Sequence, residues 1–302
     1  MENGLTILIP FVYNIKKMNK LLAQVVHELS TPADAEDLLY HHADGHPLPS
    51  LSVLGEVVDL CRSILFPGYF GHSGISDNTL IYHTGINVEK LYYKIVDQVK
   101  AGLCFAEKGE CVLTEVENIA TEFIARLPHL RRLLATDVRA AYEGDPAATC
   151  YAEVISCYPA IRAISNYRIA HELHLLGVPL IPRIITEMAH SETGIDIHPA
   201  ASIGSHFTID HGTGVVIGAT CIIGNHVKLY QGVTLGAKSF PLDAQGNPIK
   251  GIDRHPILED NVIVYSNSTI LGRITIGHDA IIGGNVWVTE DVAPNAKVLQ
   301  RR

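Results

Sequence analysis

A histidine in a glycine-rich turn is the residue of this sequence best suited to chemistry. The run Ile209-Asp-His-Gly-Thr-Gly214 interrupts a regular repeat and places His211 beside two glycines. A neutral imidazole can take a proton from an alcohol at physiological pH. Asp196 lies fifteen residues earlier, close to one repeat coil of eighteen, so the two residues are predicted on neighbouring coils, where a carboxylate would fix the imidazole tautomer. A structural alternative stays open, in which Asp210 and His211 only satisfy backbone groups at a distorted corner.

The first 190 residues, which must help to position these groups, follow a helical period. Apolar residues recur at i, i+3, i+4 and i+7 from Val88 to Val99, and Asn87 is placed to cap that helix. Less regular stretches of the same kind cover residues 18–29, 50–65, 113–126, 129–142, 160–176 and 180–190. We therefore predict an all-helical N-terminal domain over residues 1–190. Residues 1–130 give no functional indication beyond assembly and stability.

The remaining residues, 191–302, follow a repeat of six. Aliphatic residues stand at Ile197, Ile203 and Ile209, and after a slip of two the same step resumes at Ile217 and continues. Three such hexads close one triangular coil, so we predict a parallel β-helix of four to five coils, that is, a helical domain followed by a β-solenoid. The segment 238–254 breaks the repeat with prolines and glycines and is predicted to protrude as a loop.

Composition limits the classes of function. The chain has 302 residues, 47% of them hydrophobic, and a net charge of −9, which gives no general reason to bind nucleic acid or an anionic membrane. The apolar run at residues 5–12 is too short to span a bilayer, and its flanking charges reverse the order of a secretory signal. The six cysteines include no C-x-x-C pair and are expected to be buried thiols in a reducing cytosol, which predicts a cytoplasmic protein.

Short motifs in a fixed order cover roughly residues 130 to 295. They are Asp145-Pro, Tyr167-Arg-Ile-Ala-His, Asp196-Ile-His-Pro-Ala-Ala-Ser-Ile-Gly, Asp210-His-Gly-Thr-Gly-Val-Val-Ile-Gly, Gln231-Gly-Val-Thr-Leu-Gly and Asp253-Arg-His-Pro. Together they resemble the serine O-acetyltransferases of the hexapeptide-repeat acyltransferase superfamily. The resemblance implies a left-handed β-helix and transfer of an acetyl group from acetyl-CoA to L-serine, the first step of cysteine biosynthesis.

The same resemblance implies a role for each matching residue. His211 would be the general base and Asp196 its orienting partner. Asp145 and Asp210 match the carboxylates that receive the serine ammonium group. The serine carboxylate would be held by a cationic pair, Arg254 and His255.

An amino acid needs anchors of both signs and its hydroxyl needs a base, so this inventory suits serine and requires no metal. The transfer is expected to be direct, because nothing beside His211 looks like an activated cysteine nucleophile. Cys221 is better explained as part of an inward-facing row.

Coenzyme A binding is expected along the groove between neighbouring β-helices. The resemblance places it at main-chain groups near Gly236, Ala237 and Ser266. The sequence departs from the family there, with Tyr265-Ser-Asn267 in place of the small Gly-Ala-Gly residues that are common. Lys238 follows Ala237 and could pair with a phosphate, although a solvated loop lysine explains it as well.

The resemblance also implies partners. We expect a homotrimer or a dimer of trimers, with cysteine as a feedback inhibitor that uses the serine anchors. Relatives that dock cysteine synthase end in an isoleucine tail, whereas this chain ends at Arg302. Docking of cysteine synthase is therefore predicted to be weak or absent.

Three other functions remain open on the sequence. A related transferase could acetylate a sugar or another amino acid, but it would not need Asp145 and Arg254 together. A γ-class carbonic anhydrase shares the β-helix, and His206 and His211 are spaced for zinc, but no third ligand among His198, His226, His255 and His278 stands in a matching motif. A noncatalytic scaffold would not require an intact pair of His211 and Asp196.

Overall fold

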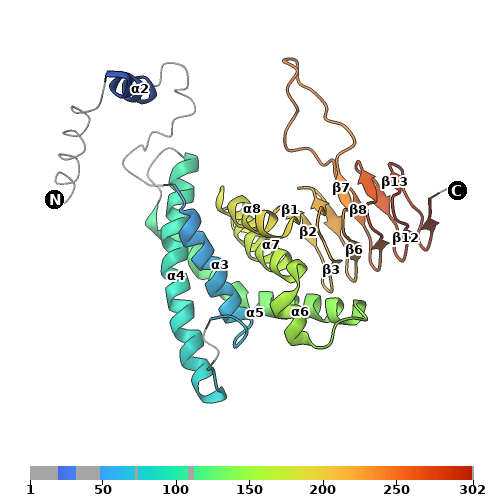
Figure 1. Cartoon of the computed structure of the whole chain (residues 1–302), viewed down its shortest axis with the longest axis horizontal. Coiled ribbons are helices and arrows are strands. Elements are labelled where there is room, and N and C mark those ends of the chain that lie inside the picture. The colour runs from blue at the N-terminus through green and yellow to red at the C-terminus, as the bar shows by residue number, and fades with distance from the viewer. Residues whose placement is uncertain (1–19, 32–47, 72–73, 108–111, 301–302) are drawn as a thin grey trace. The chain divides into compact units, whose positions relative to one another are not determined.

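The computed structural model describes residues 20–31, 48–71, 74–107 and 112–300 (Figure 1). The chain divides into two compact units, Met1–Gly45 and His46–Arg302. The first contributes α2 (Lys20–Ser30), which has no buried residue. The apolar run at residues 5–12 and the terminal Arg302 lie outside the described residues. No described helix is long and apolar enough to cross a membrane.

In the residues that the structure describes, the second unit begins with six helices, as the helical period predicts. They are α3 (Leu51–Leu65), α4 (Asp77–Glu107), α5 (Leu113–Gly144), α6 (Tyr151–Cys157), α7 (Pro159–Leu175) and α8 (Ile181–Thr193). Ser50 caps α3 by accepting the Val53 N–H, and Pro159 opens α7 at a position where its missing N–H costs nothing.

Two helix boundaries differ from the sequence prediction. Asn87 does not start a helix: it lies inside α4, where its side-chain amide donates to the Ser63 hydroxyl at 3.2 Å. Pro128 does not separate two helices, because α5 continues through it. Leu127 and Leu130 are buried on either side of that proline, and we attribute the unbroken helix to this packing, which overrides the local cost of the proline.

A parallel β-solenoid of about five coils follows the helices, which confirms the predicted fold class. Its three sheets have the strand orders β1-β4-β7-β10-β13, β11-β8-β5-β2 and β14-β12-β9-β6-β3. The strands are β1 (Asp196–Ile197), β2 (Ser202–Ile203), β3 (Thr208–Asp210), β4 (Val216–Ile217), β5 (Ile222–Ile223), β6 (Lys228–Tyr230), β7 (Thr234–Gly236), β8 (Ile257–Leu258), β9 (Ile263–Val264), β10 (Thr269–Leu271), β11 (Thr275–Ile276), β12 (Ile281–Ile282), β13 (Trp287–Val288) and β14 (Lys297–Val298). The left-handed sense of the coil stays a prediction.

The inward residues of successive coils stack on one another. Ile197, Ile217, Leu235 and Ile270 are register partners in one sheet, and all are buried. Each coil donates its strand N–H groups to carbonyls of the next coil, as Asp196 does to Val215 at 2.9 Å. The first coil therefore has carbonyls on its outer edge that no earlier coil can satisfy.

Helix α7 supplies the missing donors. The Tyr167 hydroxyl donates to the Ala201 carbonyl at 2.5 Å, and the Arg168 guanidinium donates to the Ile203 and Gly204 carbonyls at 2.6 Å each. A ring nitrogen of His171 lies 2.8 Å from the Pro199 carbonyl. The polar residues of the Tyr167-Arg-Ile-Ala-His motif thus cap the open end of the solenoid.

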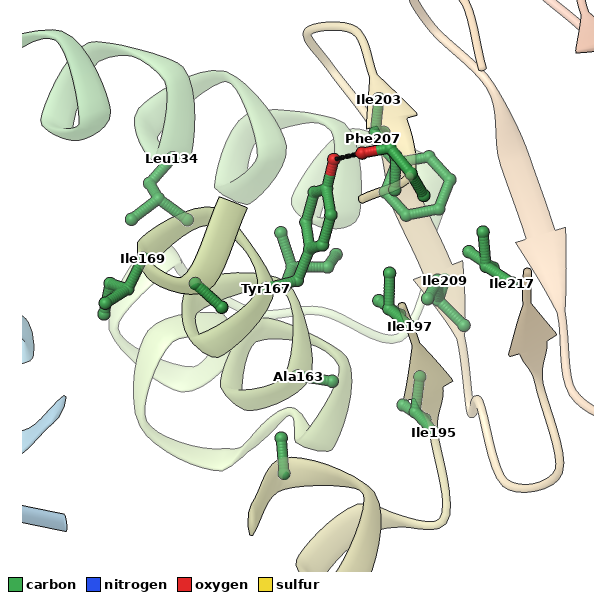
Figure 2. Close-up of a cluster of buried hydrophobic side chains, with 14 of the residues drawn as sticks. Leu134, Ala163, Tyr167, Ile169, Ile195, Ile197, Ile203, Phe207, Ile209 and Ile217 are labelled. Carbon is green, nitrogen blue, oxygen red and sulfur yellow. Dashed lines mark hydrogen bonds between the residues drawn. The ribbon is translucent and has the colours of Figure 1, made fainter. Parts of the chain in front are cut away.

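The same joint has an apolar core. Figure 2 shows Leu134 of α5 and Ala163 and Tyr167 of α7 in one cluster with side chains of the first coil, among them Ile197. The buried Asp137 pairs with Arg168 at 3.1 Å and accepts the Phe207 N–H at 3.0 Å. Helices and coil are therefore packed as one body. The change from helix to strand falls between Thr193 and Asp196, while the predicted domain boundary at 190/191 stays a prediction.

Not all cysteines follow the prediction of buried thiols. Cys61 and Cys221 are buried thiols, Cys104 is buried but disulfide-bonded, and Cys150 and Cys157 are exposed thiols. Cys150 is the N-cap of α6 and Cys157 is its last residue, and this short helix buries only Val154 and Ile155. Cys111 lies outside the described residues.

Candidate active site

A cavity of about 280 Å³ lies where the end of α5 and the start of α7 meet β3 and β6. Three of the residues predicted for the site, Asp145, Asp210 and His211, line it. Tyr158 and Lys228, which the sequence analysis did not single out, line it as well.

His211 stands at the corner where the first coil turns from β3 toward β4. Its backbone adopts a left-handed conformation with φ of +56°, and 77% of its side chain is exposed. Gly212 follows with φ of +99°, and a Cβ there would lie 2.4 Å from Cδ1 of Ile195. The turn therefore needs glycine at 212 and presents the imidazole to solvent at the cavity.

Asp210 is held by a lysine. Its Oδ2 lies 3.0 Å from Nζ of Lys228, and its Oδ1 lies 3.8 Å from Nε2 of His211. Lys228 also donates to the Gly144 carbonyl at 2.7 Å. Burial lowers the pKa of Lys228, but hydrogen bonds with Tyr230 and Asp210 outweigh this effect, and the net shift is upward. The lysine therefore stays protonated at neutral pH.

Asp145 is fixed by two donors at the end of α5. Its Oδ2 accepts the Tyr158 hydroxyl at 2.6 Å, and its Oδ1 accepts the Ala147 N–H at 2.8 Å. These bonds, that of Tyr158 first, hold the pKa of Asp145 below its usual range, and the same contact raises the pKa of Tyr158 to about 12. Asp145 is an oriented anion, and each oxygen keeps a lone pair for a ligand.

Asp196 starts the same coil that His211 closes, not a neighbouring coil. The first coil is 20 residues long, measured from Asp196 to its register partner Val216, and the second is 18 residues long, measured from Val216 to Thr234. The slip in the repeat lengthens the first coil by two residues. The Asp196 carboxylate lies 3.6 Å from the Arg183 guanidinium. No hydrogen bond or ion pair among the described residues joins Asp196 to His211, so that pairing stays a prediction.

His255 occupies a different corner of the coil, just before β8. The residue is 7% exposed, and its Nδ1 lies 2.8 Å from the Thr220 hydroxyl. Burial lowers the pKa of His255, and the neighbouring Arg254 and Arg273 lower it further. A Cβ on Gly218 would lie 2.0 Å from the His255 ring, so only glycine leaves room for it.

Arg254 lies at the same corner and has one hydrogen-bond donor, its Nε, without a partner in the described part of the chain. Its backbone N–H bonds to the Thr220 hydroxyl at 3.0 Å, and its guanidinium lies 5.6 Å from the centre of the Phe240 ring. This Nε is buried. A buried donor of this kind needs a partner, which an anionic ligand or an ordered water can supply. The predicted site residues of one chain therefore fall into two groups, which we call half-sites, one at His211 and one at Arg254.

The residues expected near coenzyme A are also divided between corners. Gly236 ends β7, and Ala237 follows it at the corner that holds Arg254. Ser266 lies between β9 and β10, and His211 lies between β3 and β4. Both are therefore at a turn between the same two sheets. Beside Ser266, Tyr265 is 41% exposed and stacks on Tyr230 with ring centres 4.9 Å apart. The path of the ligand stays a prediction.

Residues 238–254 leave the coil between β7 and β8 (Figure 1). All of them except Arg254 are exposed, and an isolated bridge joins Leu242 to Pro248.

Sequence reasoning missed three contributors to these half-sites, namely Tyr158, Thr220 and Lys228. Lys228 is a charged residue between the apolar Val227 and Leu229 of a predicted strand, and this was the one signal in the sequence that could have pointed to any of the three. Tyr158 precedes the proline that starts α7, and Thr220 sits in a turn. Only their tertiary contacts distinguish them from ordinary surface residues.

The histidines that suggested zinc do not converge. His206 stacks on His226 with ring centres 4.1 Å apart, at a corner other than that of His211. The one group of potential metal ligands in the described residues is Glu187, His190 and Asp196, which includes neither His206 nor His211. The carbonic anhydrase alternative has no geometric support.

Comparison with known proteins gives a consistent result. The chain is 47% identical over 275 residues to a plasmid-encoded serine acetyltransferase of Synechococcus elongatus, covering 87% of this chain and 86% of that protein. It is 45% identical to a serine acetyltransferase of Mycobacterium tuberculosis over 54% of this chain and 67% of that protein. No protein-family model matches.

Solved structures agree. Serine acetyltransferase isoform 3 from Entamoeba histolytica, in complex with cysteine, matches with a TM-score of 0.71 and 33% identity over 95% of this chain and 92% of that one. The Neisseria gonorrhoeae serine acetyltransferase in complex with serine matches with a TM-score of 0.53 and 25% identity over 85% and 97%.

Proposed function

The chain belongs to the serine acetyltransferase family and is a serine O-acetyltransferase, and from this premise we propose which residues carry out the transfer. Acetyl-CoA and L-serine are converted to O-acetyl-L-serine and CoA. The observation that carries the proposal is the cavity in which the exposed imidazole of His211 stands beside the fixed carboxylates of Asp145 and Asp210.

His211 acts as general base and then as general acid. Its neutral imidazole takes the proton of the serine hydroxyl as that oxygen attacks the thioester carbon. The C–S bond then breaks, and the imidazolium returns the proton to the departing CoA thiolate. The acetyl group passes directly to serine, without an acyl-enzyme and without a step that needs a metal.

Asp196 is proposed to orient the imidazole. Its backbone N–H donates to the carbonyl of Val215, four residues from His211, which brings the start of the first coil close to the corner that holds His211. Arg183 contacts the Asp196 carboxylate in this structure. Pairing with His211 therefore requires the carboxylate to be shared with, or released by, that arginine.

The anchors for serine come from the two half-sites. Asp145 and Asp210 flank the ammonium group, while Arg254 and His255 hold the carboxylate. Because the half-sites lie at different corners of the coil, we propose that the Arg254 corner of a neighbouring copy completes the cavity at His211. Binding both substrates there makes the attack effectively unimolecular.

A symmetric homotrimer satisfies this arrangement, because each copy then offers one corner of each kind to its neighbours. Coenzyme A would lie in the groove between two β-helices, near Gly236, Ala237 and Ser266. Pairing of two such trimers is the second possible assembly.

The structure determined with cysteine in a relative supports a regulatory role for that amino acid. Cysteine differs from serine at one atom, so it can occupy the same ammonium and carboxylate anchors and act as a feedback inhibitor. We accordingly place the enzyme in the cytoplasm, at the first step of cysteine biosynthesis.

The test measures CoA release from acetyl-CoA with L-serine, homoserine or glucosamine as acceptor, with and without a metal chelator. The informative variant is His211→Asn, because asparagine tolerates the left-handed backbone at this corner. We expect its kcat to fall by ~10²–10⁴-fold, the usual contribution of a general base. His278→Asn, at an exposed histidine away from the cavity, is the matched control and should keep full activity.

Turnover only with homoserine or glucosamine would show that the anchors have been misassigned. A His211→Asn variant with nearly parental kcat would remove His211 from the mechanism. Sensitivity to the chelator would contradict a metal-free transfer.

A further inference from the structure

Lys228 is the one permanent cation among the residues that line the cavity at His211, and no role follows for it from the reaction itself. Its side chain is 16% exposed, so most of it is held inside the protein. Its Nζ contacts the Asp210 carboxylate at 3.0 Å and the Gly144 carbonyl at 2.7 Å, and lies 4.6 Å from the centre of the Tyr230 ring.

These contacts join the two elements that supply the carboxylates. Asp210 ends β3, on the solenoid, and Gly144 is the last residue of α5, directly before Asp145. A lysine at the C-terminal end of a helix is favoured, since it satisfies a carbonyl that the helix leaves unpaired. Lys228 therefore fixes the distance between Asp145 and Asp210 across the cavity.

The contacts also make the two carboxylates unequal. Asp210 is compensated by the adjacent ammonium of Lys228. Asp145 accepts hydrogen bonds only from neutral donors, the Tyr158 hydroxyl and the Ala147 N–H, and Lys228 lowers its pKa less than these two bonds do, so no cation contacts its carboxylate directly. An incoming ammonium group is attracted more strongly to the carboxylate that has no cation in direct contact with it.

We propose that Lys228 is a positioning residue that reserves Asp145 for the substrate ammonium group, while Asp210 serves to hold Lys228 and the turn of His211. This inference rests on the proposed function and refines it. It follows that an amino acid without a free α-ammonium group loses its contact with Asp145 and not with Asp210.

The test compares Lys228→Met, Asp210→Asn and the double variant with Lys297→Met. Lys297 is the matched control because it is an exposed lysine on the same sheet, in β14. We expect Lys228→Met to raise the KM for L-serine by ~10–100-fold, the range for a lost charge-assisted contact, with a smaller change in kcat and no change in the KM for acetyl-CoA.

The double variant separates the electrostatic role from simple structural damage. Without Lys228, the bare Asp210 carboxylate competes for the ammonium group, so adding Asp210→Asn should recover ~3–10-fold of the lost serine affinity. Lys228→Arg keeps the charge and should also lie closer to the parent. Thermal unfolding of each variant confirms that the fold is retained.

The inference would be overturned if Lys228→Met kept the parental KM for serine. It would also be overturned if the KM values for serine and acetyl-CoA rose equally, or if the double variant had a higher KM for serine than either single variant. A parent enzyme without serine-dependent CoA release contradicts the proposed function instead. The two failures are therefore distinguishable.

Discussion

At the scale of single residues, the orientation of Asp145 depends on the Tyr158 hydroxyl. We predict that Tyr158→Phe raises the KM for serine by ~3–10-fold, because one net hydrogen bond to a charged group is lost. The kcat should stay within about twofold, since Tyr158 does not touch His211 in this arrangement. Initial-rate kinetics measure both. Tyr82→Phe, at an exposed tyrosine on α4, is the control, and an unchanged KM in Tyr158→Phe would contradict the role of the hydroxyl.

Arg254 gives a second prediction at this scale. Its buried, unpartnered Nε is the donor that a serine carboxylate would satisfy. Arg254→Met should therefore raise the KM for serine by ~100-fold, and Arg254→Lys should rescue little of it, because a lysine cannot form two parallel bonds. Rescue by lysine to near the parental KM would mean that only charge matters there.

At the scale of elements, the corner at Gly218 determines where His255 lies. Gly218→Ala would place a methyl group 2.0 Å from the ring, so we expect His255 to be displaced and the KM for serine to rise. Gly85→Ala, inside α4 with open space around it, is the control and should stabilise the protein by ~0.5–1 kcal/mol. Steady-state kinetics and thermal unfolding distinguish the two effects.

The joint between α7 and the first coil is a stability element. Tyr167→Phe leaves the Ala201 carbonyl without its donor in a buried place, which should lower the free energy of unfolding by ~1–3 kcal/mol. Urea unfolding measures the loss, and Tyr151→Phe, at an exposed tyrosine of α6, is the comparison. Equal stability of Tyr167→Phe and the parent would show that the carbonyl finds another donor.

At the scale of the whole molecule, the separation of the two half-sites predicts complementation between inactive variants. His211→Asn inactivates the corner at His211, and Arg254→Met inactivates the corner at Arg254. A site shared between two copies is therefore intact when the Arg254→Met copy supplies His211 and the His211→Asn copy supplies Arg254. In randomly mixed trimers about a quarter of the sites meet this condition. Co-expression with two tags and purification of mixed oligomers tests it. Mixed oligomers with no recovered activity would show that one chain supplies the complete site.

The pH dependence of stability belongs to the same scale. Burial, with Arg183 and His174 nearby, lowers the pKa of His198 from 6.5 to about 4, and its Nδ1 accepts the Ala200 N–H at 3.1 Å. Between these pH values the unfolded chain binds a proton that the folded protein does not. Stability contributed by His198 is therefore present above pH 6.5 and is lost as the pH falls toward about 4.

His198→Asn keeps an acceptor near the position of Nδ1 but cannot be protonated. We expect it to lose less stability than the parent between pH 7 and pH 5 in urea unfolding. Burial is also the main cause that lowers the pKa values of His171, His206 and His255. The pH dependence of stability should therefore be smaller in His198→Asn than in the parent, but still present. An identical loss in parent and variant would exclude His198 as a contributor.

The sequence by itself determined the period of each half and the position of the reactive turn. A repeat of six and a helical period are local properties, carried by residues a few positions apart, so they predicted the solenoid, the helices and the displayed His211. The ordered motifs identified the family in advance, and the comparisons confirm it. Locality was also the source of error, because the helix through Pro128 and the interior position of Asn87 depend on packing from other elements.

Only the tertiary structure decided which groups meet. Which corner a residue occupies depends on the accumulated length of the coils, and the slip at 209–214 and the loop at 238–254 change that length in a way that motif spacing does not resolve. Thus Arg254 and His255 lie apart from His211, and the carboxylate of Asp196 forms an ion pair with Arg183 at 3.6 Å. The pairing of Lys228 with Asp210 and the capping of the first coil by Tyr167 and Arg168 join segments 18 to 36 positions apart, so they follow from three-dimensional contact and not from sequence pattern.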